Sequence, residues 1–261
     1  MQTDARARGL EGAGWYASAF WITTLLHELA HAVAGLVVGR GPVLHTTFVS
    51  YVRDGTTSDQ IVTALAGPLF SATSGLALLA WSRSAKVPAR LEPLVTWLAY
   101  HGLVNFVGYT FSVSFAPAGD LGRVAALLEV PVWLRIVITI AGFGLLRLVA
   151  RPFGAVFATS AEAPLEDEAA ARALARRTTL AAWIATPALV LAALPVPHWL
   201  ALVYTVAAPL PLFDLPDALV RERARAGRAR TRGERPWIAI AVALVIVIVS
   251  RVLLDAGVSL E

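Results

Sequence analysis

The segment WYASAFWITTLLHELAHAVAGLVV, residues 15–38, decides how this chain folds. It is longer than the roughly 20 apolar residues that a helix needs to cross the hydrocarbon core of a bilayer. Within it, His27 and His31 are four residues apart and therefore face the same side of a helix, with Glu28 between them. Ionisable side chains at that depth in a membrane are costly, so we expect these three to serve a function.

The whole chain has the composition of a membrane protein. Hydrophobic residues make up 57% of its 261 residues and charged residues 15%, whereas about 25% of the residues in soluble domains are charged. We therefore predict an all-α, polytopic transmembrane helix bundle of about seven spans, at residues 15–38, 60–81, 92–113, 131–150, 179–195, 198–215 and 236–255. The predicted organisation is a polar N-terminal tail (1–14), a membrane core (15–150), a soluble linker helix (151–178) and C-terminal transmembrane helices (179–261).

A short β-structure is predicted directly after the first span. The segment Val43–Val52 (VLHTTFVSYV) is rich in β-branched and aromatic residues that partly alternate with polar ones. Asp54-Gly55 is a typical turn sequence. We expect a strand or hairpin that closes at this turn.

The basic residues are distributed unevenly along the chain. With a cytoplasmic N-terminus, most of the 22 lysines and arginines fall in cytoplasmic loops, as the positive-inside rule requires. Loops 39–59 and 114–130 then lie on the opposite face. The arginine-rich segment 221–235 lies between two spans, so we expect it to contact the lipid bilayer and not nucleic acid. A cysteine-free multispan chain rich in alanine, valine and arginine is typical of a bacterial plasma membrane.

The His-Glu-x-x-His pattern predicts a metal site. Two histidines at this spacing on a helix can bind one zinc ion, and the glutamate can accept a proton from water. Catalytic zinc takes three protein ligands and keeps one position open. The chain has no cysteine, so the third ligand must be a histidine or a carboxylate; the candidates are His45, Asp54, Asp59, His101, Asp120 and Asp214.

Among these candidates we favour Asp120. It begins an expected short helix in the sequence AGDLGR, residues 118–123, beside apolar residues. An aspartate at this position also suits the N-cap of that helix. The spacing is equally compatible with a ligand and with a cap.

Taken together, these features resemble the site-2 protease family of intramembrane zinc metalloproteases. The resemblance covers residues 15–150 and rests on the His27-Glu28-x-x-His31 motif, on Ala66-Gly67-Pro68 in the next span, and on the later pattern Asn105, Pro117, Asp120, Gly122 and Arg123. Gly119 and Leu121 replace a leucine and a glycine of the family pattern. The resemblance implies that His27, His31 and Asp120 hold Zn²⁺, with Glu28 and Asn105 as catalytic residues.

The predicted function is hydrolysis of peptide bonds in membrane protein substrates. Glu28 would accept a proton from a water activated by zinc, and Asn105 or His101 would stabilise the developing oxyanion. The strand at 43–52 would offer an edge for an unwound substrate segment. The alternatives are a non-catalytic metal-binding scaffold or regulator closed by a fourth ligand (His45 or His101), a zinc hydrolase acting on a lipid or small amide, and an ion or proton transporter.

Overall fold

The computed structural model describes residues 2–84, 86–159, 161, 165, 167–194, 199–223 and 236–260, most of which are helical. The helices are α1 (Gln2–Val37), α2 (Thr57–Ser82), α3 (Glu92–Ser112), α4 (Asp120–Leu127), α5 (Val132–Val149), α6 (Arg151–Thr159), α7 (Glu168–Ala193), α8 (Trp199–Ala207), the 3-10 helix η1 (Leu210–Asp214), α9 (Leu215–Glu222) and α10 (Pro236–Leu254). The strands are β1 (Pro42–Leu44), β2 (Val49–Tyr51) and β3 (Val258–Ser259). The predicted helical bundle with β-structure after the first span is confirmed.

The predicted number of spans needs correction. Within the described residues, 5 helical segments are long and apolar enough to cross a membrane: Gly9–Val37, Thr57–Ser82, Val132–Thr159, Leu202–Glu222 and Trp237–Leu254. The segments expected at 92–113 and 179–195 are helical but do not belong to this set. Polar side chains such as His101 and Asn105 make α3 less apolar than a typical span. The apolar part of α7 begins only after Arg177, so this part is shorter than the roughly 20 residues that a span needs.

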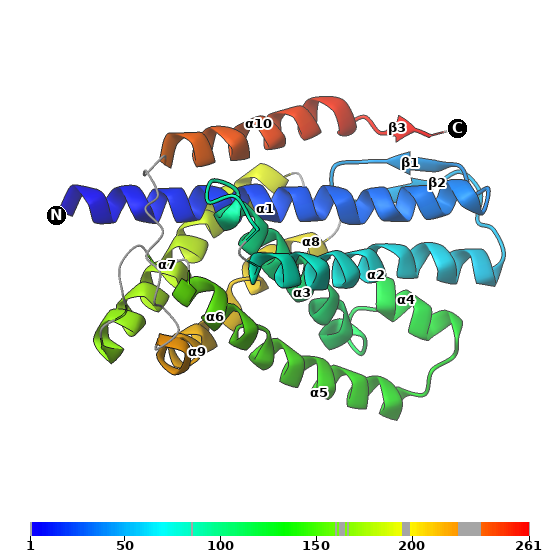
Figure 1. Cartoon of the computed structure of the whole chain (residues 1–261). Coiled ribbons are helices and arrows are strands. Elements are labelled where there is room, and N and C mark those ends of the chain that lie inside the picture. The colour runs from blue at the N-terminus through cyan, green and yellow to red at the C-terminus, as the bar shows by residue number, and fades with distance from the viewer. Residues whose placement is uncertain are drawn as a thin grey trace.

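Helix α1 is the longest helix and runs the length of the molecule (Figure 1). Helix α10 lies along one side of it, and α2 and α3 pack on another. A Cβ atom on Gly14 of α1 would stand 2.8 Å from the backbone of Ala239, so this glycine permits the close approach of α1 and α10. The largest fully buried side chains of the core include Tyr16, Trp21, Tyr100 and Phe153.

The small residues of α2 permit close packing against α3. A Cβ atom on Gly75 would stand 2.9 Å from the backbone nitrogen of Leu103. Helix α2 begins with a capping box, in which Thr56 and Asp59 exchange hydrogen bonds. Pro68 lies inside the same helix. The start and the packing face of α2 are therefore both encoded locally.

The sheet has three strands in the order β2-β1-β3, all antiparallel. Strands β1 and β2 form the hairpin expected between Val43 and Val52, but its turn lies at residues 45–48, before Asp54-Gly55. The third strand comes from the C-terminal end of the chain, where β3 follows α10 and reaches the hairpin beside α1 (Figure 1). β2 therefore remains at the edge of the sheet.

Two of the expected segments, the N-terminal tail and the linker, are parts of longer helices in the structure. Helix α1 begins at Gln2, so the expected tail (1–14) is helical over its described part. Helix α7, capped by Asp167, joins the end of the expected linker (151–178) to the apolar segment that follows it. Residues 224–235 of the arginine-rich segment lie outside the described residues.

Candidate metal centre

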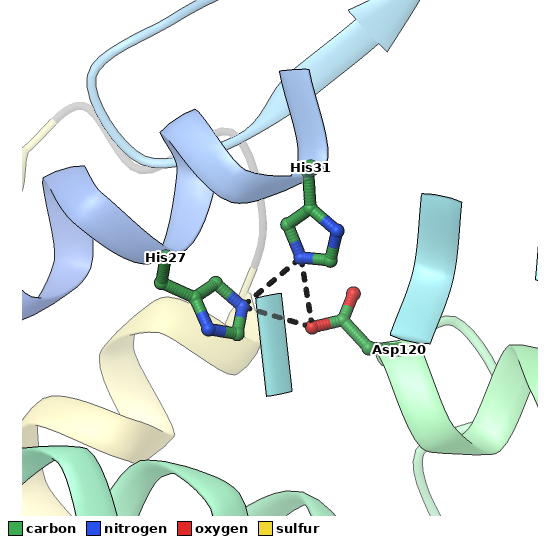
Figure 2. Close-up of side chains that lie close together, drawn as sticks. All are labelled: His27, His31 and Asp120. Atoms are coloured by element: carbon green, nitrogen blue, oxygen red, sulfur yellow. Dashed lines mark hydrogen bonds and ion pairs between the residues drawn. The ribbon is translucent and has the colours of Figure 1, made fainter. Parts of the chain in front are cut away.

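Three predicted ligands meet at one point of the structure. His27 and His31 project from adjacent turns of α1, and Asp120 reaches them from the first turn of α4 (Figure 2). The Nε2 atoms of the two histidines are 3.0 Å apart, and Oδ2 of Asp120 lies 3.0 Å from Nε2 of His27 and 3.2 Å from Nε2 of His31. Within the described part of the chain, no other set of histidines and carboxylates gathers in this way.

Each histidine is held by its other ring nitrogen. Nδ1 of His31 lies 2.6 Å from the carbonyl oxygen of Thr63, and Nδ1 of His27 lies 3.0 Å from the hydroxyl of Ser71. A carbonyl only accepts, so Nδ1 of His31 carries the proton, and Nε2 of the neutral ring presents a lone pair. Tyr109 stacks on His27 at a centroid distance of 5.3 Å and fixes the plane of that ring. Such outer contacts are typical of metal-binding histidines.

The three ligand atoms fit a divalent metal ion. Two lone pairs and a carboxylate oxygen that converge in this way repel one another unless a proton or a cation lies between them. The ligand atoms of tetrahedral zinc, with bonds of about 2.0–2.1 Å, lie about 3.3 Å apart. The observed separations of 3.0–3.2 Å are close to this value. The two histidines are also buried, and Asp120 is partly exposed.

Asp120 is not the N-cap that the sequence left as an alternative. It is the first residue of α4, Gly119 holds the cap position, and no side chain caps the helix. The carboxylate is instead directed at the two histidines. Burial alone would raise the pKa of Asp120, but the positive charge that His31 carries whenever its Nε2 is also protonated, together with hydrogen bonds to both histidines, lowers the pKa of Asp120 below its usual range. The carboxylate is therefore held in the ionised form that binds metal.

Glu28 and Asn105 lie beside this group, in the wall of a cavity of about 620 Å³ that also contains the three ligands. Glu28 is buried, lies close enough to both histidines and Asp120 to interact with their charges, and makes no hydrogen bond to another described residue. Oδ1 of Asn105 is buried and likewise has no hydrogen-bond partner among the described residues. The Glu28 carboxylate and the Oδ1 atom of Asn105 are thus free to interact with a molecule in the cavity, while the side chain of Asn105 also contacts Tyr204.

The remaining ligand candidates lie elsewhere. His45 contacts Ser50 and stacks on Phe48 within the hairpin. Asp54 is exposed in the loop before α2, and Asp59 caps that helix. Asp214 pairs with Arg147 of α5 through two hydrogen bonds of 2.6 Å.

His101 is fully buried among aromatic rings of the core. Tyr16 and Phe20 lie edge-on to it at centroid distances of 4.5 and 5.5 Å. Neither of its ring nitrogens has a hydrogen-bond partner among the described residues. It does not line the cavity, so the structure separates His101 from Asn105, with which the sequence had grouped it as a possible oxyanion donor.

Sequence reasoning missed the part that α2 plays in the site. Thr63, Gly67 and Ser71 follow one another at four-residue intervals and form one face of this helix against the two histidines. The available signal was the regular recurrence of small and hydroxyl residues in an otherwise apolar span.

Comparison of the chain with protein-family models, with curated proteins and with solved structures finds no match. The functional conclusion is therefore drawn from the geometry of the site and from its setting among helices long enough to cross a membrane.

Proposed function

We propose that this protein is an intramembrane zinc metalloprotease that cleaves membrane protein substrates in a bacterial plasma membrane. The observation that carries the proposal is the meeting of His27 and His31, on a helix long enough to span a bilayer, with Asp120 of the short helix α4, at 3.0–3.2 Å. Three protein ligands are the number that catalytic zinc takes. No further histidine or carboxylate joins the three in the described part of the chain, which favours an open site over a closed structural one.

Glu28 is the proposed general base. When bound, zinc supplies Lewis-acid activation of water and of the scissile carbonyl. Glu28 lines the same cavity as the three ligands and has no competing hydrogen bond among the described residues. It can therefore accept a proton from the attacking water and deliver it to the leaving amine. Asn105 lies in the cavity wall, where its unpartnered Oδ1 would accept a hydrogen bond from an N–H of the substrate backbone. Its Nδ2 would be the atom that donates to the oxyanion.

The edge of β2 is the proposed contact for an unwound substrate segment. β1 pairs on both sides, whereas β2 pairs with a described strand only on one side. Val49 and Tyr51 of this strand line the cavity. A segment that added to this edge would place its peptide bonds along the wall that leads to the metal ligands.

Two alternatives make different use of the same residues. A non-catalytic scaffold or regulator would keep the metal and have no use for a free Glu28 carboxylate. A zinc hydrolase acting on a lipid or small amide would keep the chemistry but not the strand edge. The cavity, at about 620 Å³ with β2 in its wall, favours an extended peptide.

The first experiment measures the metal content of the detergent-purified chain by mass spectrometry. We expect about one zinc per chain in the wild type and in Glu28→Gln, and loss of zinc in His27→Ala, His31→Ala and Asp120→Ala. His45→Ala and Asp54→Ala are matched controls that should retain zinc, because neither residue joins the site. Absence of metal from wild-type protein prepared without chelators would refute the proposal.

The second experiment measures proteolysis with quenched fluorescent transmembrane peptides. The wild type should cleave at least one of them, and Glu28→Gln should be slower by about 10²–10⁴-fold while it keeps its zinc. If zinc is bound but wild type and Glu28→Gln are equally inactive on peptides, the scaffold and the lipid or amide hydrolase become the better explanations. Release of fatty acids or amines from small substrates would then identify the hydrolase.

A further inference from the structure

Two arginines line the cavity near the metal ligands without an acidic partner. Arg40 follows α1, and Arg123 lies on α4 three residues after Asp120, on the same face of that helix. Arg40 is only 3% exposed, whereas Arg123 is exposed at the surface of the cavity. No carboxylate of the described residues lies within ion-pair distance of either one.

The contacts of Arg40 hold it in place but leave part of it free. Its Nη1 donates to the hydroxyl of Thr63 at 2.5 Å, its Nε donates to the carbonyl of Arg53 at 3.3 Å, and its guanidinium carbon lies 3.8 Å above the ring of Tyr51. Its Nη2 makes no hydrogen bond to a described residue. A buried guanidinium held only by neutral groups is costly, because nothing offsets its charge.

Neighbouring residues of α2 bring the two arginines together. Arg123 donates from Nη2 to the side-chain oxygen of Gln60 at 2.9 Å, and Arg40 binds Thr63, one helical turn further along. Residues three apart on a helix are neighbours on its surface. Burial is the main cause that lowers the pKa of the Arg40 guanidinium, and the positive charge of Arg123 lowers it further. Asp54 and Asp59 act on Arg40 only from beyond ion-pair distance, and Asp59 is already engaged in capping α2.

The pair is adjacent to the proposed metal. Thr63 contacts both sites, since its hydroxyl accepts from Arg40 while its carbonyl binds Nδ1 of His31. Asp120 and Arg123 are likewise one turn apart on α4. An extended peptide advances by roughly 3.3–3.6 Å per residue. If one of its peptide bonds lies at the metal, a carboxylate only a few residues away along the same peptide would therefore lie between the two guanidinium groups.

We propose that Arg40 and Arg123 form a carboxylate-binding site in the wall of the cavity. Its ligand is a peptide segment with an acidic side chain or a free C-terminal carboxylate within a few residues of the metal. Arginine suits this task because its planar donors match the two oxygens of a carboxylate. The role of the pair in selecting substrates rests on the proposed proteolytic function, but its binding of a carboxylate does not.

The test measures binding with catalysis disabled. Three short peptides with a neutral fluorophore, which differ only in their carboxylate, are titrated by fluorescence anisotropy against the detergent-purified full chain carrying Glu28→Gln. One peptide ends in a carboxamide, the second in a free carboxylate, and the third carries an internal glutamate and a carboxamide end. We expect at least one carboxylate peptide to bind about tenfold more tightly than the neutral peptide, as hydrogen bonds to charged groups predict.

Arginine variants identify the source of that preference. Arg123→Gln and Arg40→Gln should each reduce the ratio of affinities for the carboxylate and the neutral peptide to about one. Arg40→Lys should keep part of the preference. Arg123 is exposed, so its substitution tests the proposal even if the buried Arg40→Gln variant fails to fold. Arg53→Gln is the matched control and should keep the full preference, because Arg53 donates to the carbonyl of Gly39 and does not line the cavity.

Three outcomes would overturn the inference. The first is equal binding of the three peptides, and the second is a preference for carboxylate peptides that persists in Arg123→Gln. The third is that binding of an anionic phospholipid depends on Arg123 while binding of the peptides does not, which would make the pair a lipid headgroup site. Comparison of the peptide with a free C-terminal carboxylate and the peptide with an internal glutamate shows whether the site binds the carboxylate of a chain end or that of a side chain. A protein that discriminates the peptides but never cleaves one would retain this inference and lose the proposed function.

Discussion

A Cβ atom on Gly67 would stand 2.7 Å from Nε2 of His27, and closer still to Nε2 of His31. These two nitrogens are the proposed metal ligands, so at Gly67 helix α2 approaches them with its backbone. A methyl group at this position would push at least one imidazole out of the arrangement in which the two nitrogens lie 3.0 Å apart.

We therefore expect Gly67→Ala to weaken zinc binding by about tenfold or more, comparable with the loss of an outer contact of a metal ligand. Alanine favours a helix more than glycine does, so the fold of α2 should be kept. Gly144→Ala, where an added Cβ meets nothing within 4 Å, is the matched control. Competition with a fluorescent zinc chelator measures both affinities, and equal affinity in the two variants would contradict the packing of Gly67 on the histidines.

Ser71 provides a second prediction, because it contacts His27 on the side away from the other ligands. Its hydroxyl lies 3.0 Å from Nδ1 of His27 and fixes the orientation of that ring. Ser71→Ala should lower zinc affinity by about 10–100-fold without removing a ligand. Ser74→Ala is the control, since Ser74 bonds only carbonyl groups of its own helix. An unchanged affinity in Ser71→Ala would show that the hydroxyl does not orient His27.

The residues of the site were predictable where their spacing is local. A four-residue interval places His27 and His31 on one face of any helix, whatever the rest of the chain does. Asp120 was harder, because its partners are about 90 positions away, as the sequence separations of 93 and 89 residues show. Its placement at the start of a short helix marked it only as a ligand or a cap.

The contribution of α2 and the third strand could not be predicted from local pattern. Thr63 uses its backbone carbonyl to hold His31, and a carbonyl carries no residue signature. Strand β3 has only the residues Val258–Ser259, and it reaches β1 because α10 packs along α1. The span count was overestimated for a related reason: α3 is apolar enough to be buried by its neighbours, yet too polar to qualify as a span.

The C-terminal end of the chain anchors the hairpin, which gives a prediction about pH. Oδ1 of Asp255 accepts from the hydroxyl of Thr46 at 2.7 Å and from Arg251 at 2.9 Å. The hydrogen bond from Thr46, aided by Arg251, lowers the pKa of Asp255. A folded-state pKa below the unfolded value of about 3.9 means that the contact stabilises the fold fully above that pH and is lost as the pH falls through the folded pKa.

Amides of residues 42–51 should therefore lose hydrogen-exchange protection as the pH falls below about 4, after correction for the intrinsic exchange rate. Asp255→Asn should show a few-fold lower protection already at neutral pH, and its protection should no longer depend on acid in this range. Asp167→Asn, at the distant cap of α7, should leave the hairpin unchanged. A hairpin that is equally protected in Asp255→Asn would show that the C-terminal contact does not anchor it.

The edge of β2 gives the sharpest test of how a substrate binds. The backbone nitrogen of His45 bonds the oxygen of Phe48, and that of Val52 bonds the oxygen of Gly41. Because hydrogen-bonded and non-bonded pairs alternate along an antiparallel ladder, the N–H of Val49 points away from β1 toward the open edge. Val49→Pro removes this donor without breaking the hairpin, since proline is tolerated at such positions.

We expect Val49→Pro to keep its zinc and to cleave transmembrane peptides at least tenfold more slowly than Val49→Ala, which loses the same side chain but keeps the N–H. The loss should appear in the KM, because the removed hydrogen bond holds the substrate and does no chemistry. Cleavage of short, water-soluble peptides should be less affected, since they need no strand pairing to expose their amides. If Val49→Pro and Val49→Ala cleave transmembrane peptides equally well, the substrate does not pair with β2.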